Sequence, residues 1–140
     1  MLLHRRFNAC APVFAFVLAL AVAGCGTTSS GNSFKGAAHE AATAVENFQS
    51  HANSGEGSKI CSEDLSASIV KRLGGDKGCE EAMKHQLAQV DNLEATVQSI
   101  KVAPGGRSAT ATVKGIRSGK TALTNLSLIK EGSHWRVAGP

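Results

Sequence analysis

The sequence predicts an α+β fold in which about three amino-terminal helices precede a four-stranded, antiparallel, curved sheet. Up to Leu93 the apolar residues recur at the three- and four-residue spacing of helices, and beyond it they alternate with polar residues as in strands. Glycine-rich segments separate these periodic stretches. Because the helices come first and the strands follow, we expect two layers packed around one core.

The first helix is expected over residues 34–52. Its apolar residues recur at steps of three and four, so they share one face, which we expect to lie in the core. Residues 55–57, with two glycines, mark its end. The apolar face consists of Phe34, Ala38, Ala41, Val45, Phe48 and Ala52.

Two shorter helices are expected before the sheet. Ser62 is the residue type that caps a helix, and the glycines at residues 74–75 would end the helix that it starts. A third helix would open at Asp76 or Gly78. The apolar stripes are Leu65, Ile69 and Leu73 in the second helix and Met83, Leu87 and Val90 in the third.

Four strands are expected over residues 95–103, 107–116, 121–130 and 134–138. The turn-forming segments 104–106, 118–120 and 132–133 separate them. Within the strands, residues on one face of the sheet should be apolar and those on the other polar. The residues expected on the packed face include Ala109, Ala111, Val113, Trp135 and Val137.

Cys61 and Cys79 are the two cysteines expected within the folded domain. A pair of cysteines in an exported protein favours a disulfide, and closing 17 intervening residues would stabilise the domain by about 3 kcal/mol. Two free thiols are one alternative. A zinc site with His51 and His85 is another, although the paired ligand spacing of zinc sites is absent from the sequence.

The first 25 residues have the organisation of an export signal. Arg5 and Arg6 are followed by an apolar run over residues 11–23, which is shorter than the roughly 20 residues that span a membrane. The run ends in Leu20-Ala21-Val22-Ala23-Gly24-Cys25, which resembles the lipobox of bacterial lipoproteins. The alternative is an ordinary secretory signal with an incidental cysteine.

The lipobox resemblance implies that residues 1–24 are removed as a signal peptide and that the Cys25 thiol carries a diacylglyceryl group. It also implies acylation, such as by palmitate, of the new amino terminus. Several acyl chains give stable anchoring where one does not. We therefore expect a protein anchored to a bacterial cell membrane on its extracytoplasmic face. Residues 25–33 are polar after the cysteine and should form a flexible tether, followed by one domain over residues 34–140.

Charge is distributed unevenly along the expected domain. Residues 34–94 contain six basic and ten acidic residues, whereas residues 95–140 contain seven basic and one acidic. A basic half could contact anionic lipid or acidic wall polymer, and the alternative is a solvated sheet face. Nucleic acid is not an expected partner, because the mature chain has few aromatic residues for base stacking. The basic residues are Lys101, Arg107, Lys114, Arg117, Lys120, Lys130 and Arg136.

Several short motifs accompany this order of elements: Val45-x-x-Phe48, Gly55-Glu56, the following Cys61 and the final Gly132-x-x-Trp135-x-Val137. Together they resemble small lipoproteins of the nuclear-transport-factor-2-like (cystatin-like) superfamily. The resemblance implies a cone with a pocket between sheet and helices. Members use this pocket for binding, assembly or, in some cases, catalysis, and commonly form homodimers through the sheet.

Four residues are candidates for lining such a pocket: His85, Asp91, Glu94 and His134. The chain has no tyrosine to polarise a substrate, so we assign no catalytic residue, cofactor or metal, and expect the four as solvated groups. The function expected is a non-catalytic binding or interaction module for an envelope protein or a small hydrophobic ligand. The alternatives are a structural lipoprotein contacting anionic lipid or wall polymer, and a small hydrolase or isomerase.

Overall fold

The computed structural model describes residues 31–90, 92–117 and 120–140. In this part of the chain, four α-helices precede four strands, which confirms the α+β fold. The helices are α1 (Ala37–Asn53), α2 (Gly57–Lys59), α3 (Ala67–Arg72) and α4 (Gly75–Leu87). A 3₁₀ turn, η1 (Gly31–Ser33), precedes α1, and a π-helical turn, η2 (Ile60–Asp64), joins α2 to α3.

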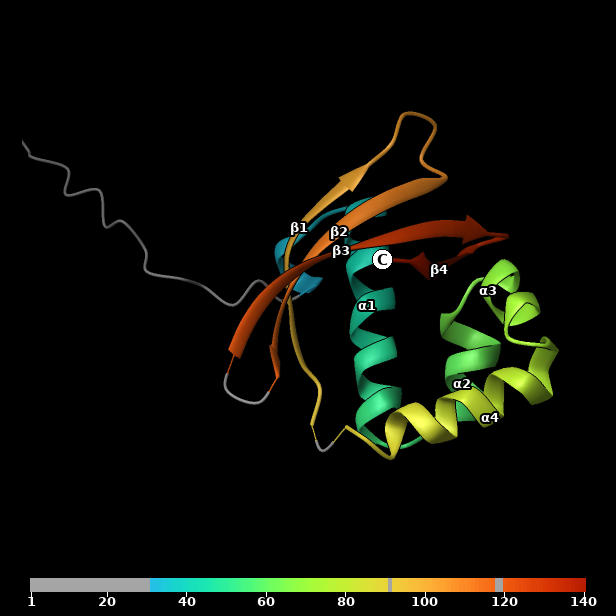
Figure 1. Cartoon of the computed structure of the whole chain (residues 1–140). Helices are drawn as coiled ribbons and strands as arrows, with labels where there is room; N and C mark the ends of the chain where they lie inside the picture. Colours follow the sequence, from blue (N-terminus) through green and yellow to red (C-terminus); the bar gives the residue numbers. More distant parts are fainter. Residues whose placement is uncertain (1–30, 91, 118–119) are drawn as a thin grey trace, which may run out of the picture.

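The strands form one open antiparallel sheet in the order β1-β2-β3-β4. They are β1 (Glu94–Val102), β2 (Ser108–Arg117), β3 (Lys120–Glu131) and β4 (His134–Gly139), so their predicted bounds differ from the structure by at most one residue. The sheet curves over α1, and the shorter helices lie beyond α1 (Figure 1).

One hydrophobic cluster, the sheet core, lies between α1 and the sheet. Ala111 is fully buried in β2, and Leu128 in β3 is 1% exposed. Small residues on α1 let the helix approach the sheet closely, since alanine adds little bulk beyond the backbone. The alternation predicted for β2 and β4 is confirmed. The buried members are Ala41, Ala42, Ala44, Val45, Val97, Ala109, Ala111, Val113, Leu128 and Trp135.

A second cluster, the helical core, lies among η2, α3, α4, the end of α1 and β4. Its buried members are Ala52, Ile60, Cys61, Leu65, Val70, Cys79 and Val137. The sulfur atoms of Cys61 and Cys79 are 1.99 Å apart, which confirms the predicted pairing at disulfide distance. The backbone also links this cluster to the sheet, because Leu65 forms an isolated parallel bridge with Val137.

The prediction that Ser62 caps a helix is wrong. Ser62 lies within η2, and the residue that caps α3 is Ser66, whose hydroxyl accepts from the backbone N–H of Ile69 at 3.4 Å. The chain cannot continue as a helix between them because Leu65 is extended and bridges to Val137. The backbone N–H of Ser66 donates to the Val137 carbonyl at 2.9 Å.

Three other boundaries differ from expectation, and the first is the start of the first helix, which is Ala37 rather than Phe34. Val90, predicted on the buried stripe of the third helix, is 37% exposed because α4 ends three residues earlier, at Leu87. Part of the predicted tether is folded: Gly31 in η1 is buried, its N–H donates to Glu46 and its carbonyl lies 2.8 Å from His39 Nδ1.

The amino-terminal predictions fall outside the described residues. The signal peptide over residues 1–24 and the lipidation site Cys25 are among these. Within the part that the structure describes, no helix combines the length and apolar character that crossing a membrane requires.

Candidate functional site

A groove of about 490 Å³ lies between α1, η2 and β4. Polar positions one helical turn apart on α1, between residues 39 and 47, form one wall. Glu63 and Asp64 of η2 contribute to the lining, as do residues 133–136 of β4 and the turn before it. The groove therefore adjoins both hydrophobic cores.

Glu40 holds the groove together on the side of the sheet core. Its Oε2 accepts from Lys130 Nζ at 2.7 Å and from Trp135 Nε1 at 3.2 Å. These two hydrogen bonds, with that from Lys130 the stronger influence, lower the pKa of the Glu40 carboxyl group. Lys130 Nζ also lies 5.9 Å from the centre of the Trp135 ring, within cation–π range. Glu40, as an ionised carboxylate, therefore accepts the Trp135 hydrogen bond and fixes the position of the ring.

Asp64 is a buried carboxyl group on the side of the helical core. It is only 4% exposed, and its Oδ2 lies 2.7 Å from Nδ1 of His51 on α1. Burial raises the pKa of Asp64, although the hydrogen bond to His51 acts in the opposite direction. The other ring nitrogen of His51 lies 4.0 Å from Glu56. This chain of groups connects η2 to α1 beneath the groove.

Arg136 joins the groove to the helical core from β4. Its Nη1 donates to the Ser62 carbonyl of η2 at 2.7 Å, and its Nε lies 3.6 Å from Glu131. Glu131 in turn accepts from the backbone N–H of Ala67, the first residue of α3. These contacts hold the β3–β4 end of the sheet against two helical segments.

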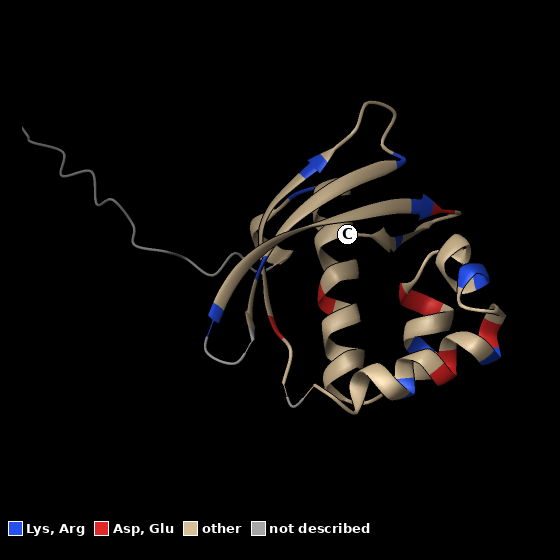
Figure 2. Cartoon of the chain, viewed as in Figure 1, with Lys and Arg blue, Asp and Glu red and all other residues tan. Residues whose placement is uncertain are grey.

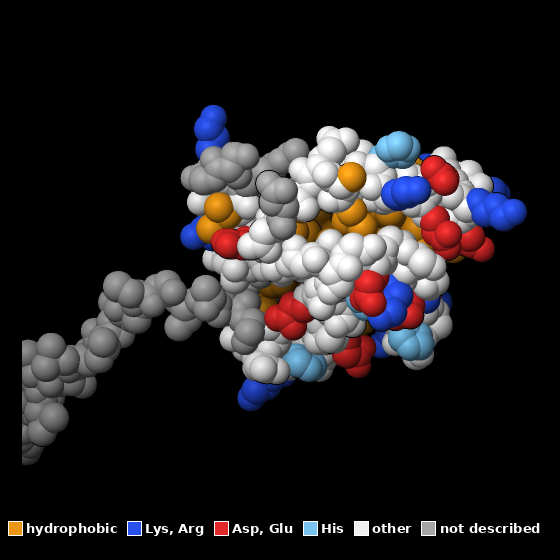
Figure 3. Space-filling model, turned by 90° about the horizontal axis from the view of Figure 1, so that it is seen from below, with side chains coloured by type: hydrophobic (Ala, Val, Ile, Leu, Met, Phe, Trp, Pro, Cys, Tyr) orange, Lys and Arg blue, Asp and Glu red, His pale blue; other side chains and the backbone are white. Residues whose placement is uncertain are grey.

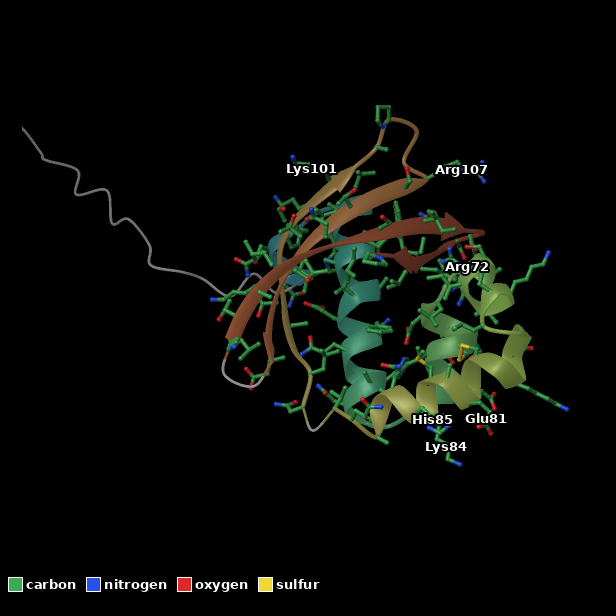
Figure 4. All side chains as sticks on the ribbon, in the orientation of Figure 1. Arg72, Glu81, Lys84, His85, Lys101 and Arg107 are labelled. Atoms are coloured by element: carbon green, nitrogen blue, oxygen red, sulfur yellow. A yellow bond between two sulfur atoms is a disulfide. The ribbon has the colours of Figure 1, made fainter. Side chains whose placement is uncertain are left out.

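The three pocket candidates within the described residues do not come together. His134 lines the groove, at the start of β4, and is exposed. His85 is exposed in the last turn of α4 and points away from the body of the molecule (Figure 4). Glu94 is exposed at the start of β1, where it accepts from Asn92 at 3.3 Å, and Asp91 lies outside the described residues.

The zinc alternative is not supported by the geometry. Cys61 and Cys79 are paired with each other, His51 faces Asp64, and His85 is on the exposed surface of α4. Across residues 31–90, 92–117 and 120–140, no three histidine, cysteine or carboxylate side chains are grouped closely enough to bind a metal ion.

The basic residues of the carboxyl-terminal half are spread over the molecule rather than gathered in one patch (Figure 2). Lys130 and Arg136 are paired with Glu40 and Glu131. Lys101 and Arg107 lie near the β1–β2 turn (Figure 4). The remaining three, Lys114, Arg117 and Lys120, belong to the end of the sheet where β2 is followed by β3.

A hydroxyl and an imidazole lie side by side where the groove meets the start of β4. Ser133 Oγ and His134 Nδ1 are 3.1 Å apart, but both residues are exposed. Among the described residues, no carboxylate forms a hydrogen bond with the His134 ring, as a third group orienting a catalytic base would. The Thr43 hydroxyl donates to the His39 carbonyl of its own helix.

Comparison of the chain with family models, with curated proteins and with solved structures finds no match. The two family resemblances read from the sequence therefore stay predictions.

Sequence reasoning missed most of the groove. Glu40, His51 and Asp64 meet their partners through contacts between residues on different elements of the chain. The one available signal was the polar stripe of α1, formed by Glu40, Thr43 and Asn47 beside the apolar face.

Proposed function

We propose that this chain is a bacterial envelope lipoprotein, anchored through Cys25, whose domain is a non-catalytic binding module. The observation that carries the binding role is the groove between α1, η2 and β4. Its walls are fixed by hydrogen bonds from opposite sides, through Glu40 and through Asp64, so the site is preformed.

The location rests on two features. Residues 1–25 have the charged head, short apolar run and Gly24-Cys25 ending of a lipoprotein signal. The cysteine pair Cys61–Cys79, at disulfide distance in the helical core, suits an oxidising compartment such as the cell envelope. Both features agree with an extracytoplasmic domain.

The superfamily resemblance supports the same role. An open, curved sheet that covers a long first helix, with shorter helices at one side, is the layout expected of a cystatin-like cone. The groove borders both α1 and the last strand of the sheet, which is compatible with a pocket between helices and sheet. Its partner is a small molecule or a segment of another envelope protein.

The anchor is tested by substitution of two cysteines outside the described domain. Cys25→Ser should release the protein from the membrane fraction or leave it unprocessed, because no thiol remains to be acylated. The matched control, Cys10→Ser, removes a cysteine of the expected signal peptide and should leave the protein in the membrane fraction. Retention of Cys25→Ser protein in the membrane with a normal mature size would contradict the anchor.

The groove is tested by photo-crosslinking in intact cells. A crosslinking residue in place of His134 should capture a specific partner, and Asn47→Trp, which fills the groove from its α1 wall, should abolish capture. The control replaces His85, an equally exposed histidine away from the groove, and should give no product. Equal products at positions 134 and 85, unaffected by Asn47→Trp, would contradict the groove as the binding site.

A further inference from the structure

The end of the sheet at which β2 is followed by β3 projects beyond the helical layer. Every residue from 120 to 125 is exposed, whereas β3 becomes buried at Leu128. The neighbouring strand β4 pairs only with residues 127–131, so the first half of β3 has no strand on that side among the described residues. This end is therefore the least covered part of the described sheet.

Two large apolar side chains are exposed there. Leu123 is 68% exposed and Ile116 is 40% exposed, and Val90 is the one other exposed large hydrophobic residue among those the structure describes. Leu123 lies opposite Lys114, and Ile116 lies opposite Thr121, which makes Leu123 and Ile116 diagonal neighbours on the sheet. They share the face turned away from α1, because Val113, three positions before Ile116, is buried against α1.

The charge of this end is positive. Residues 114–125 include three basic and no acidic residues. Lys114 and Lys120 are exposed, and neither takes part in an ion pair within the described residues. Glu94 lies opposite Ile116 on β1, so one acidic group borders the surface. Exposed apolar side chains flanked by unpaired lysines are typical of surfaces that contact anionic lipid.

The attachment point of the expected tether favours the same partner. Gly31 is fixed to α1 through Glu46 and His39, and five residues separate it from Cys25. An extended chain covers at most about 3.6 Å per residue, so a lipid at Cys25 would hold Gly31 within about 20 Å of the bilayer. The η1 turn and the β2–β3 end both lie toward one side of the molecule, away from α3 (Figure 1).

We propose that Lys114, Ile116 and Leu123 form a membrane-docking surface that contacts anionic lipid headgroups. Lys120, opposite Arg117, lies on the other face of the sheet and adds positive charge at the same end. Figure 3 shows apolar side chains reaching the surface at this end of the molecule, beside basic groups. The inference rests on the proposed lipid anchor, because the anchor supplies an effective concentration in the millimolar range and makes even a weak contact sufficient.

Docking by this surface would also orient the groove. Residues 133–136, which line the groove, follow β3, and the docking surface lies at the beginning of β3. Along the chain, residues 124–132 separate Leu123 from this segment. A domain docked through Leu123 would therefore place the β4 wall of the groove farther from the bilayer than the start of β3.

The test uses the mature lipidated protein on vesicles, with a polarity-sensitive fluorophore on an introduced cysteine. Leu123→Cys places the fluorophore on the docking surface, and Thr110→Cys places it on the same exposed sheet face near the other end of β2. Vesicles are made of phosphatidylcholine alone or mixed with phosphatidylglycerol. We expect a blue shift at position 123 with the anionic vesicles, no shift at position 110, and loss of the shift when Lys114→Glu and Lys120→Glu are added.

Flotation of the same samples separates two kinds of failure. Protein that floats with both vesicles but reports equal exposure at positions 123 and 110 would overturn the docking surface and leave the anchor intact. A label at position 123 that is already shielded without lipid would overturn it in favour of self-association or a protein partner. Protein that does not float would overturn the proposed anchor together with the inference that rests on it.

Discussion

The sheet core and the helical core are stabilised in different ways. The sheet core lies between the 17-residue helix α1 and strands of up to 12 residues, joined by continuous backbone hydrogen bonding from β1 to β4. The helical core is built on η2, α3 and α4, with the end of α1 and β4, and both η2 and α3, of five and six residues, are far shorter than helices that are stable alone. Their order depends on contacts from elsewhere in the chain.

Several of those contacts join the helical region to other elements. The Cys61–Cys79 pair joins η2 to α4, Leu65 bridges to Val137, and Asp64 faces His51. The wall of the groove formed by η2 thus depends on the cysteine pair and the backbone bridge as well as on the packing of Ile60, whereas α1 and β4 are joined by sheet-core packing and by the hydrogen bond between Trp135 and Glu40. We therefore expect the helical region to open locally before the sheet unfolds.

The largest effect should follow from a cavity in the sheet core. Leu128→Ala removes most of a side chain that is 1% exposed and should lower the free energy of unfolding by about 3 kcal/mol or more. Leu123→Ala, on the same strand but 68% exposed, should change it by less than about 0.5 kcal/mol. Denaturant unfolding of both variants measures this, and equal losses would contradict the assignment of the core face of β3.

Removal of the crosslink should destabilise the helical region selectively. The Cys61→Ala/Cys79→Ala variant lacks the crosslink between positions 18 apart in the chain. Its free energy of unfolding should therefore be lower by about 3 kcal/mol. Hydrogen exchange should accelerate most in η2 and α4, while β2 and β3 keep most of their protection. Uniform acceleration over both cores would show that they unfold as one unit.

A smaller, pH-dependent effect should come from Asp64. Because burial raises its pKa, the folded protein resists ionisation of this group. Its contribution to stability is then fully present below the unfolded pKa of about 3.9 and declines as pH rises through the folded pKa. The advantage of the wild type over Asp64→Asn in free energy of unfolding should shrink with increasing pH.

The charged neighbours of Asp64 also affect its pKa. His51 and Arg136 favour its ionised form, and Glu63 disfavours it. If the wild-type advantage over Asp64→Asn grows with pH, the pairing with His51 outweighs burial, and the pKa of Asp64 is lowered rather than raised.

The smallest effect concerns Glu40, whose shift has the opposite sign. Its pKa is lowered by Lys130 and Trp135, so the stability that it contributes is present above the unfolded pKa of about 4.3 and is lost as pH falls through the folded pKa. Trp135, the single tryptophan of the chain, reports this directly. The fluorescence of Trp135 should change with pH, with a midpoint below about pH 4.3, and Glu40→Gln should remove this change. If the change is the same in Glu40→Gln, the hydrogen bond between Glu40 and Trp135 is contradicted.

The same contrast explains what the sequence could predict. All four strands were predicted to within one residue, because alternation and glycine-rich turns are local signals. The helical region was predicted less well. The extended conformation of Leu65, and with it the shift of the cap from Ser62 to Ser66, depends on a bridge to Val137, which no local pattern reveals.

The groove follows the same rule. The cysteine pair could be predicted by counting, and Trp135 could be assigned to the packed face from the alternation of β4. The meeting of Asp64 with His51, and of Glu40 with Trp135, could not, because each joins residues on different elements. Of the three pocket candidates that the structure describes, His134 alone lines the groove, because β4 forms one wall.

Whether a lipid at Cys25 holds this domain at a membrane can be decided by intact-mass spectrometry of the protein extracted from bacterial membranes. We expect a mature chain that begins at Cys25 and carries the added mass of a diacylglyceryl group, with Cys61 and Cys79 oxidised to a disulfide. A chain that retains residues 1–24, or one that begins at or near Cys25 without any added lipid mass, would contradict the anchor.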